Sequence, residues 1–138
     1  KKEKERAEKS LTFPGMIRVI PNTCFRMSHP AIFGVEVLAG RIKPSYLLMT
    51  KNGSMIGRIK EMQDNGITLQ EAKKGDKIAI SIDEITFGRQ VKDDDILYTH
   101  INDENERLLR QKFSNLLSDE EKELLDAISA IKEKKHGF

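Results

Sequence analysis

The stretch from Phe33 to Ile82 constrains the fold most, because it consists of short strand-like runs separated by turn residues. Asn-Gly pairs occur at 52–53 and 65–66, and such a pair favours a hairpin because both residues tolerate positive φ. Over residues 77–83, three isoleucines alternate with smaller or polar residues. This is the period of a strand with one buried face. The whole stretch therefore predicts a small barrel that binds rather than catalyses.

The chain of 138 residues divides into three parts by its pattern. Residues 1–12 begin with alternating Lys, Glu and Arg, which predicts the end of a linker helix that enters from a preceding domain. Residues 13–101 carry strand patterns, the first from Phe13 to Ile20, and residues 102–138 change to a helical period. We therefore predict a mainly β fold: a small closed β-barrel with an N-terminal linker-helix end and a C-terminal α-helical hairpin.

Two capping signals mark the helical part. Asp103 with Glu106 resembles a capping pair, Ser118 with Glu121 predicts the start of a second helix, and Gly137 its end. Each helix has an apolar stripe that needs to be buried. One interpretation packs the stripes on each other and on the barrel, and another leaves part of the groove open for an apolar or acidic peptide. The residues predicted to bind that partner are Leu109, Lys112, Phe113, Leu116, Lys122, Leu125 and Ile128.

The motifs of common enzyme classes are missing from the sequence, which has no GxxxxGK[ST] phosphate loop, no GxSxG and no HExxH. The single cysteine, Cys24, excludes an internal disulfide and a cysteine-based zinc site. The adjacent acids from Asp93 to Asp95 have diverging side chains, which favours a solvated turn over a cation site. No apolar run reaches the roughly 18 residues that span a bilayer. We expect a cytoplasmic binding module with no catalytic residue, metal or membrane contact.

Charge is unevenly distributed, although the net charge is only +2. Residues 13–60 contain seven Lys and Arg against one acid, Glu36. This basic excess could form an electrostatic footprint for a phosphate backbone. It could equally be the solvated surface of a barrel. The pattern alone leaves both interpretations open.

Four motifs in order carry a resemblance to a known family: GVEVLAGRIKP, MIGRIKEMQDNG, EAKKGDKIAISI and FGRQVKDDDILYTHI. Together they resemble the second β-barrel of translational GTPases. Combined with the helical tail, they resemble the carboxy-terminal domain, domain IV, of initiation factor five-B of archaea and eukaryotes, the counterpart of bacterial initiation factor two. One departure is Ser45, where related barrels usually have Gly after the Lys-Pro pair.

The resemblance implies a role in translation initiation on the ribosome. It implies recognition of the aminoacylated acceptor end of initiator methionyl-tRNA, and help with ribosomal subunit joining as part of a larger GTPase. GTP and magnesium would belong to the GTPase domain, so no cofactor is expected in this stretch. The residues expected to contact nucleic acid are Arg18, Arg58, Lys60, Lys73, Lys74, Lys77 and Arg89. Those implied for an aminoacyl pocket are Val35, Glu36, Glu61, Met62, Gln63, Asp64, Asn65, Gly66 and Ile78.

The predicted pocket loop is less basic than the bacterial one, because Gln63, Asp64 and Asn65 stand where Lys or Arg is expected. We therefore expect weak, salt-sensitive tRNA binding. Two alternatives remain. The resemblance also implies an interaction module that docks initiation factor one-A through the C-terminal helices. A generic RNA-binding barrel would bind charged and uncharged tRNA equally.

Overall fold

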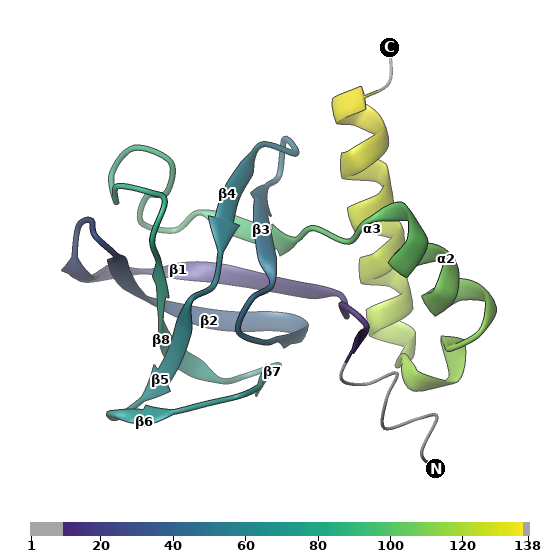
Figure 1. The fold of residues 1–138 in the computed structure, drawn as a ribbon, viewed down its shortest axis with the longest axis horizontal. Coiled ribbons are helices and arrows are strands. Elements are labelled where there is room, and N and C mark those ends of the chain that lie inside the picture. The colour runs from purple at the N-terminus through teal and green to yellow at the C-terminus, as the bar shows by residue number, and fades with distance from the viewer. Residues whose placement is uncertain (1–9, 137–138) are drawn as a thin grey trace.

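Two long antiparallel strands form the spine of the structure, a computed structural model that describes residues 10–136 (Figure 1). β1 (Gly15–Arg26) pairs with β2 (Ala31–Ile42), β1 also pairs with β9 (Ile96–Thr99), and β2 also pairs with β8 (Lys77–Ile82). The shorter strands are β3 (Leu47–Thr50), β4 (Met55–Arg58), β5 (Glu61–Asp64), β6 (Ile67–Thr68) and β7 (Ala72–Lys73). Their order is β4-β3-β9-β1-β2-β8-β5-β6, with β7 paired to β2.

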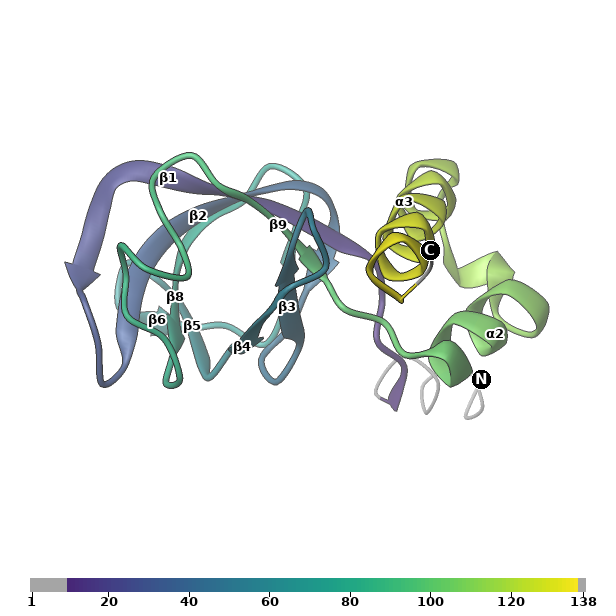
Figure 2. The same ribbon diagram turned by 90° about the horizontal axis from the view of Figure 1, so that it is seen from above.

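The sheet curls strongly about its own axis, as the view from above shows (Figure 2). The link between β4 and β5 joins the two ends of the curl. The N–H of Ile59 donates to the carbonyl of Tyr46 at 2.9 Å, and the N–H of Lys60 donates to the carbonyl of Ser81 at 2.7 Å. The predicted mainly β barrel with C-terminal helices is confirmed in the form of this curled sheet.

The interior of the curl is filled by the inward side chains of alternating strand positions. Phe33, Val35 and Val37 of β2 are at most 1% exposed, and the isoleucines of β8 lie beside them, as their alternation predicts. Each such side chain contributes roughly 1.5–3 kcal/mol by leaving water. The opposite faces of the same strands are free to carry polar groups.

A second core joins the sheet to the helices. α2 (Asp103–Gln111) and α3 (Asp119–His136), linked by the 3-10 turn η1 (Ser114–Leu116), lie beside one end of the sheet (Figure 2). Their apolar residues pack with Phe13, Ala39 and Met49 of the sheet region. The helical stripes are therefore buried mainly against the barrel. No helix among residues 10–136 is long and apolar enough to cross a membrane.

Some boundaries differ from the prediction. β1 continues to Arg26, beyond the predicted end of this strand at Ile20, because it stays paired with β2 across two irregularities. The N-cap of α2 is Asn102, whose side chain accepts the N–H of Asn105 at 2.8 Å, rather than Asp103. Residues 1–9 and Gly137 lie outside the described residues, and so do the predicted linker helix and helix stop assigned to them.

Candidate nucleic-acid interface

The register of the sheet brings together the three segments predicted to form the pocket. On one side of β8, Val35 pairs with Ile78 and Glu36 with Lys77. On its other side, Glu61 to Gln63 of β5 pair with Ser81 to Ala79. Because β5 runs antiparallel to β8, the turn that follows β5 approaches the start of β8. The turn at 64–67 and the strand entry at 74–78 therefore border the same patch of sheet.

A shallow hollow of about 70 Å³ lies on the outer face of this patch. Its lining combines apolar and polar groups: Ile32, Glu61, Gln63, Ala79, Ile80 and Ser81. The amide nitrogen of Gln63 donates to the Glu61 carboxylate at 2.6 Å. The hollow thus presents an apolar floor with acidic and amide groups along one strand. Such a site suits a small group that has both polar and apolar parts.

Of the predicted pocket residues, Glu61 and Gln63 line this hollow, and three others are buried in the core. Val35 and Met62 are fully buried and Ile78 is 6% exposed, all within the barrel core. Side chains alternate along a strand, so the residues between exposed Glu61 and Gln63 must point inward. The Met62 side chain is therefore buried behind the hollow and does not reach its surface. It supports the sheet from behind.

The remaining pocket residues lie on the surface. Glu36 is half-buried beside Arg18, and Asp64, Asn65 and Gly66 form the exposed turn between β5 and β6. Asn65 and Gly66 both have positive φ, 52° and 82°, as their Asn-Gly sequence predicts. The turn therefore projects backbone groups and one carboxylate, with no cation of its own.

Arg18 and Lys77 flank the same patch. The guanidinium of Arg18 lies 3.5 Å from the Glu36 carboxylate and 2.7 Å from that of Asp94. Lys77 is exposed at the start of β8, and no ion pair of its side chain is found within residues 10–136. Of the predicted cations, Lys77 lies beside the hollow, two residues along β8 from Ala79.

Lys73 is the last residue of β7, and Lys74 follows it and contacts α3. Lys73 lies 3.6 Å from Glu71, and Lys74 lies 2.8 Å from Glu120 of α3. Both are well exposed, so a polyanion can compete for them at little cost. Their position extends the basic edge from Lys77 toward α3.

Arg58, Lys60 and Arg89 lie apart from that edge. Arg58 donates to the carbonyl of Ser45 at 2.9 Å, and Lys60 lies 3.4 Å from Asp83. Arg89 is exposed in the 86–90 turn, whose Phe87 N–H donates to the carbonyl of Met27 at the tip of the β1–β2 hairpin. The seven predicted cations therefore do not make one continuous surface.

The residues predicted to bind a partner peptide divide by burial. Leu109, Leu125 and Ile128 are at most 1% exposed in the second core. Leu109 and Leu125 still reach the floor of a groove of about 350 Å³ with Lys122 at its rim. Phe113 and Leu116 are partly buried, and Lys112 is exposed over the Phe113 ring at 5.4 Å. The predicted packing of the stripes on the barrel thus describes most of this surface.

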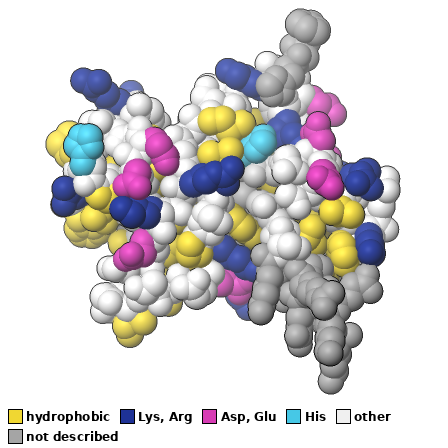
Figure 3. Space-filling model, viewed as in Figure 1, with side chains coloured by type: hydrophobic (Ala, Val, Ile, Leu, Met, Phe, Trp, Pro, Cys, Tyr) yellow, Lys and Arg dark blue, Asp and Glu magenta, His cyan; other side chains and the backbone are white. Residues whose placement is uncertain are grey.

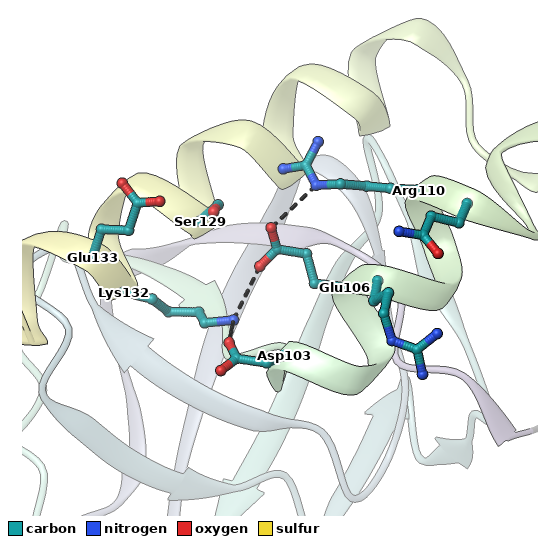
Figure 4. A pocket seen from close by; sticks show the side chains of 8 residues that line it. Asp103, Glu106, Arg110, Ser129, Lys132 and Glu133 are labelled. Atoms are coloured by element: carbon teal, nitrogen blue, oxygen red, sulfur yellow. Dashed lines mark hydrogen bonds and ion pairs between the residues drawn. The ribbon is translucent and has the colours of Figure 1, made fainter.

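A second cleft between α2 and α3, of about 480 Å³, is rich in charge (Figure 4). Glu106 lies between Lys132 and Arg110, 3.1 Å from each. Burial alone would raise the pKa of Glu106, but the hydrogen bonds from Lys132, Arg110 and Ser129 outweigh it and lower that pKa. Lys132 also donates to the carbonyl of Ile101 at 2.6 Å. These charges neutralise one another, which indicates that they join the two helices.

Comparison with known proteins decides the family. The model of the family described as Elongation factor Tu domain 4 matches residues 13–98, more than half of the chain. The chain belongs to this family. It is also 45% identical over 138 residues to a probable translation initiation factor IF-2 of Methanopyrus kandleri, and 46% identical over 137 residues to one of Staphylothermus marinus. Each alignment covers 99% of the chain and 23% of the relative, so the chain spans about a quarter of their length.

Solved structures agree with this family assignment. The chain superposes on the crystal structure of GDP-bound aIF5B from Aeropyrum pernix with a TM-score of 0.93 and 38% identity, covering 98% of this chain and 23% of that one. The bacterial selenocysteine-specific elongation factor EF-Sec matches with a TM-score of 0.52 and 18% identity over 71% of this chain and 17% of its own, which shows the shared fold alone. The predicted resemblance to initiation factor five-B is confirmed.

The hollow on the outer face of the sheet includes residues that were not predicted from the sequence. Ile32, Ala79 and Ser81 line it, and none was assigned a role. The sequence pattern indicated two of these positions, because Ala79 and Ser81 alternate with the buried isoleucines of β8. Small residues on an outer strand face leave room for a ligand.

The resemblance places GTP and magnesium in the GTPase domain of the longer protein. Within residues 10–136 there is no group of three His, Cys, Asp or Glu side chains that could hold a metal ion. The sequence also has no phosphate-binding loop. We assign no step of GTP chemistry to these residues.

Proposed function

We propose that this domain binds the aminoacylated acceptor end of initiator methionyl-tRNA in translation initiation. In this proposal it acts in the cytoplasm as part of a larger GTPase that helps ribosomal subunits to join. The observation that carries the proposal is the hollow on β2, β8 and β5, bordered by Lys77 and by the turn at 64–67. The near-complete match to archaeal initiation factors supports the same role.

The chemistry of the patch suits an unpaired acceptor end. Recognition of a single strand needs cations near phosphates and surfaces that accept bases or small apolar groups. Lys77 lies beside a hollow whose floor includes Ile32 and Ala79, and Lys74 and Lys73 continue the basic edge from there toward α3. The aminoacyl group is placed in the hollow and the terminal phosphates along the basic edge.

Binding should be weak, because few cations are available. Arg18 already pairs with Glu36 and Asp94, and the turn at 64–67 has no Lys or Arg. For single strands the salt slope falls by about 0.7 for each phosphate contact that is lost. Contacts with two or three lysines therefore give a shallow but measurable salt dependence.

The decisive measurement compares the binding of charged and uncharged initiator tRNA to the chain at low salt. We expect the charged form to bind more tightly. Ala79→Phe fills the hollow without changing charge, so it should remove this preference while affinity for uncharged tRNA is kept. Lys77→Ala should weaken both forms and reduce the salt slope, and Lys51→Ala, an exposed lysine of the β3–β4 turn, is the matched control. Equal binding of both forms by the unaltered chain would instead support a generic RNA-binding barrel.

The second candidate function is a docking site for initiation factor one-A on the helix pair. The groove of about 350 Å³ lined by Leu109, Leu117 and Leu125, with Lys122 at its rim, supports it. Such a groove fits a short segment with apolar and acidic residues. In a chemical-shift titration with initiator methionyl-tRNA, changes confined to residues 61–78 support the tRNA proposal. Changes confined to residues 108–131 support the interaction module.

A further inference from the structure

The tip of the β1–β2 hairpin exposes two large apolar side chains that no contact within the fold explains. Phe25 is 68% exposed and Met27 is 59% exposed. The tip projects from the end of the sheet opposite the helices (Figure 1). In the space-filling view, hydrophobic side chains gather at that end beside a histidine and both basic and acidic side chains (Figure 3). An exposed aromatic residue beside cations calls for a ligand with both a flat face and negative charge.

The tip is held by the neighbouring turn at 86–90. The N–H of Phe87 donates to the carbonyl of Met27 at 2.7 Å, and the Phe87 ring packs on Phe33 in the core with centroids 5.4 Å apart. At the base of the hairpin, the hydroxyl of Thr23 accepts the N–H of Gly34 at 2.9 Å. Phe25 is therefore presented by backbone that is anchored to the barrel, which limits the entropy lost on binding.

The hairpin tip and the neighbouring turn carry basic residues. The acids nearest to that turn along the chain are Glu84 and Asp93, and the Asp93 carboxylate accepts the N–H of Asn22 at 3.4 Å. Residues 23–31 and 86–92 contain Arg26, Arg89 and Lys92 and no Asp or Glu. Arg26 uses its Nε to donate to the carbonyl of Ser28 at 3.0 Å, which fixes the guanidinium and leaves its other N–H groups for a ligand. Within residues 10–136 the Arg89 side chain has no ion pair. The surface thus offers two guanidinium groups around an exposed aromatic ring.

We propose that this tip, formed by Phe25, Met27, Arg26 and Arg89, is a second RNA contact that binds an unpaired strand. The base stacks on Phe25, Met27 adds apolar contact, and the two arginines hold the flanking phosphates. Single-strand binding surfaces combine these same elements, cations along a backbone and an aromatic platform for a base. A protein partner would bury the apolar pair without needing the two arginines beside it, so these arginines favour nucleic acid.

The tip adjoins the hollow of the proposed acceptor-end site but has residues of its own. Ile32, which lines the hollow, pairs with Arg26 of the tip in the β1–β2 ladder. Lys77 lies at the other end of the β2–β8 ladder, five residues of extended chain or about 16 Å from Ile82 at the tip end. Stacking on Phe25 does not require recognition of an aminoacyl group, so the inference goes beyond the proposed function.

The test uses the intact chain with oligouridylate of about 12 nucleotides, single-stranded or annealed to its complement. The sequence has no Trp, so Phe25→Trp introduces one indole as a reporter. We expect its fluorescence to be quenched by the single strand and not by the duplex. Phe25→Ala should weaken single-strand binding about tenfold or more while leaving duplex binding unchanged.

The matched control is Met55→Ala, which truncates another exposed apolar side chain, 47% exposed, on the β3–β4 hairpin. It should bind as the unaltered chain does. Arg89→Ala should weaken binding of both nucleic acids and lower the salt slope. Unchanged single-strand binding by Phe25→Ala with a native melting temperature overturns the proposal, as does quenching by protein or vesicles but not by RNA. Lys77→Ala tests the acceptor-end site independently, so failure of one proposal is distinguishable from failure of the other.

Discussion

Arg41 of β2 and Glu121 of α3 form a two-point ion pair that fastens the helix pair to the barrel. Arg41 Nε lies 2.9 Å from Glu121 Oε2, and a terminal guanidinium nitrogen lies 3.2 Å from Oε1. That nitrogen also donates to the carbonyl of Leu116, and the guanidinium lies over the Phe13 ring at 4.1 Å. The Glu121 carboxylate accepts the N–H of Ser118 as well, so one residue caps α3 and docks it.

Loss of this pair should destabilise the whole chain. Both side chains are largely buried, with 18% and 10% exposed, so a variant that removes one charge leaves the other desolvated. We expect Glu121→Ala to lower the free energy of unfolding by about 2–4 kcal/mol, from the lost pair and the lost cap together. Urea unfolding measures it. Glu120→Ala, which breaks the exposed pair with Lys74, is the neighbouring control and should cost less than about 1 kcal/mol.

Stability should also depend on pH through Glu121. Burial alone would raise its pKa, but hydrogen bonds from Arg41 and Ser118 outweigh burial and lower the pKa below the ordinary 4.5. A pKa that is lower in the folded state gives stability that is present above the pKa of the unfolded chain. That stability is lost as the pH falls through the pKa of the folded chain. Wild type and Glu121→Gln should therefore differ most in unfolding free energy at neutral pH and converge below pH 4.5. A constant difference down to strong acid would contradict this assignment.

The backbone of Ser45 has a strained conformation. Its φ is +77°, a region that costs an L-residue roughly 1–2 kcal/mol. Its N–H donates to the carbonyl of Ile59 at 2.7 Å, and its carbonyl accepts from Arg58 at 2.9 Å, so the turn cannot relax without losing both bonds. Ser45→Gly should raise the unfolding free energy by about 0.5–1 kcal/mol after the entropy of glycine is counted.

At Gly40 we expect a substitution to lower the unfolding free energy. The φ of Gly40 is +70°, and a Cβ there would collide with the carbonyl oxygen of Pro14. Gly40→Ala should therefore destabilise the chain by about 2 kcal/mol or more. If both substitutions change thermal stability in the same direction, backbone conformation does not control these turns.

The sequence predicted the elements whose signals are local. The alternation of Ile78, Ile80 and Ile82 and the two Asn-Gly turns give the strands and their faces directly. The join between barrel and helices was not predictable, because Arg41 and Glu121 are 80 residues apart and each alone looks like a surface charge. The same reason hid the full length of β1, whose last residues are held by pairing with β2.

The candidate site was predicted in outline only. The resemblance named the segments at 61–66 and 74–78, and the register brings them to one patch. It did not separate inward from outward residues, so Met62 and Ile78 were assigned to a surface that they support from below. Applying the period of two to β5 and β8 separates the buried residues from Gln63, Ala79 and Ser81, which line the hollow.

Tyr46 links the start of β1 to the barrel through its buried hydroxyl. The oxygen accepts the N–H of Phe13 at 3.0 Å, and the hydroxyl donates to the carbonyl of Leu11 at 3.4 Å. Tyr46→Phe leaves that buried N–H without its acceptor and should cost about 1–3 kcal/mol, whereas Tyr98→Phe should change stability by less than about 0.5 kcal/mol.

Burial raises the pKa of Tyr46 from 10.0 to about 12. A raised folded-state pKa means that its stability is complete below pH 10 and is lost as pH rises toward 12. In Tyr98→Phe, Tyr46 is the only tyrosine left of two, so an ultraviolet titration of tyrosinate reports it alone. We expect a midpoint near 12 that coincides with the onset of alkaline unfolding. A midpoint near 10 in the folded chain would show that the hydroxyl is solvated and that the link to Phe13 and Leu11 is open.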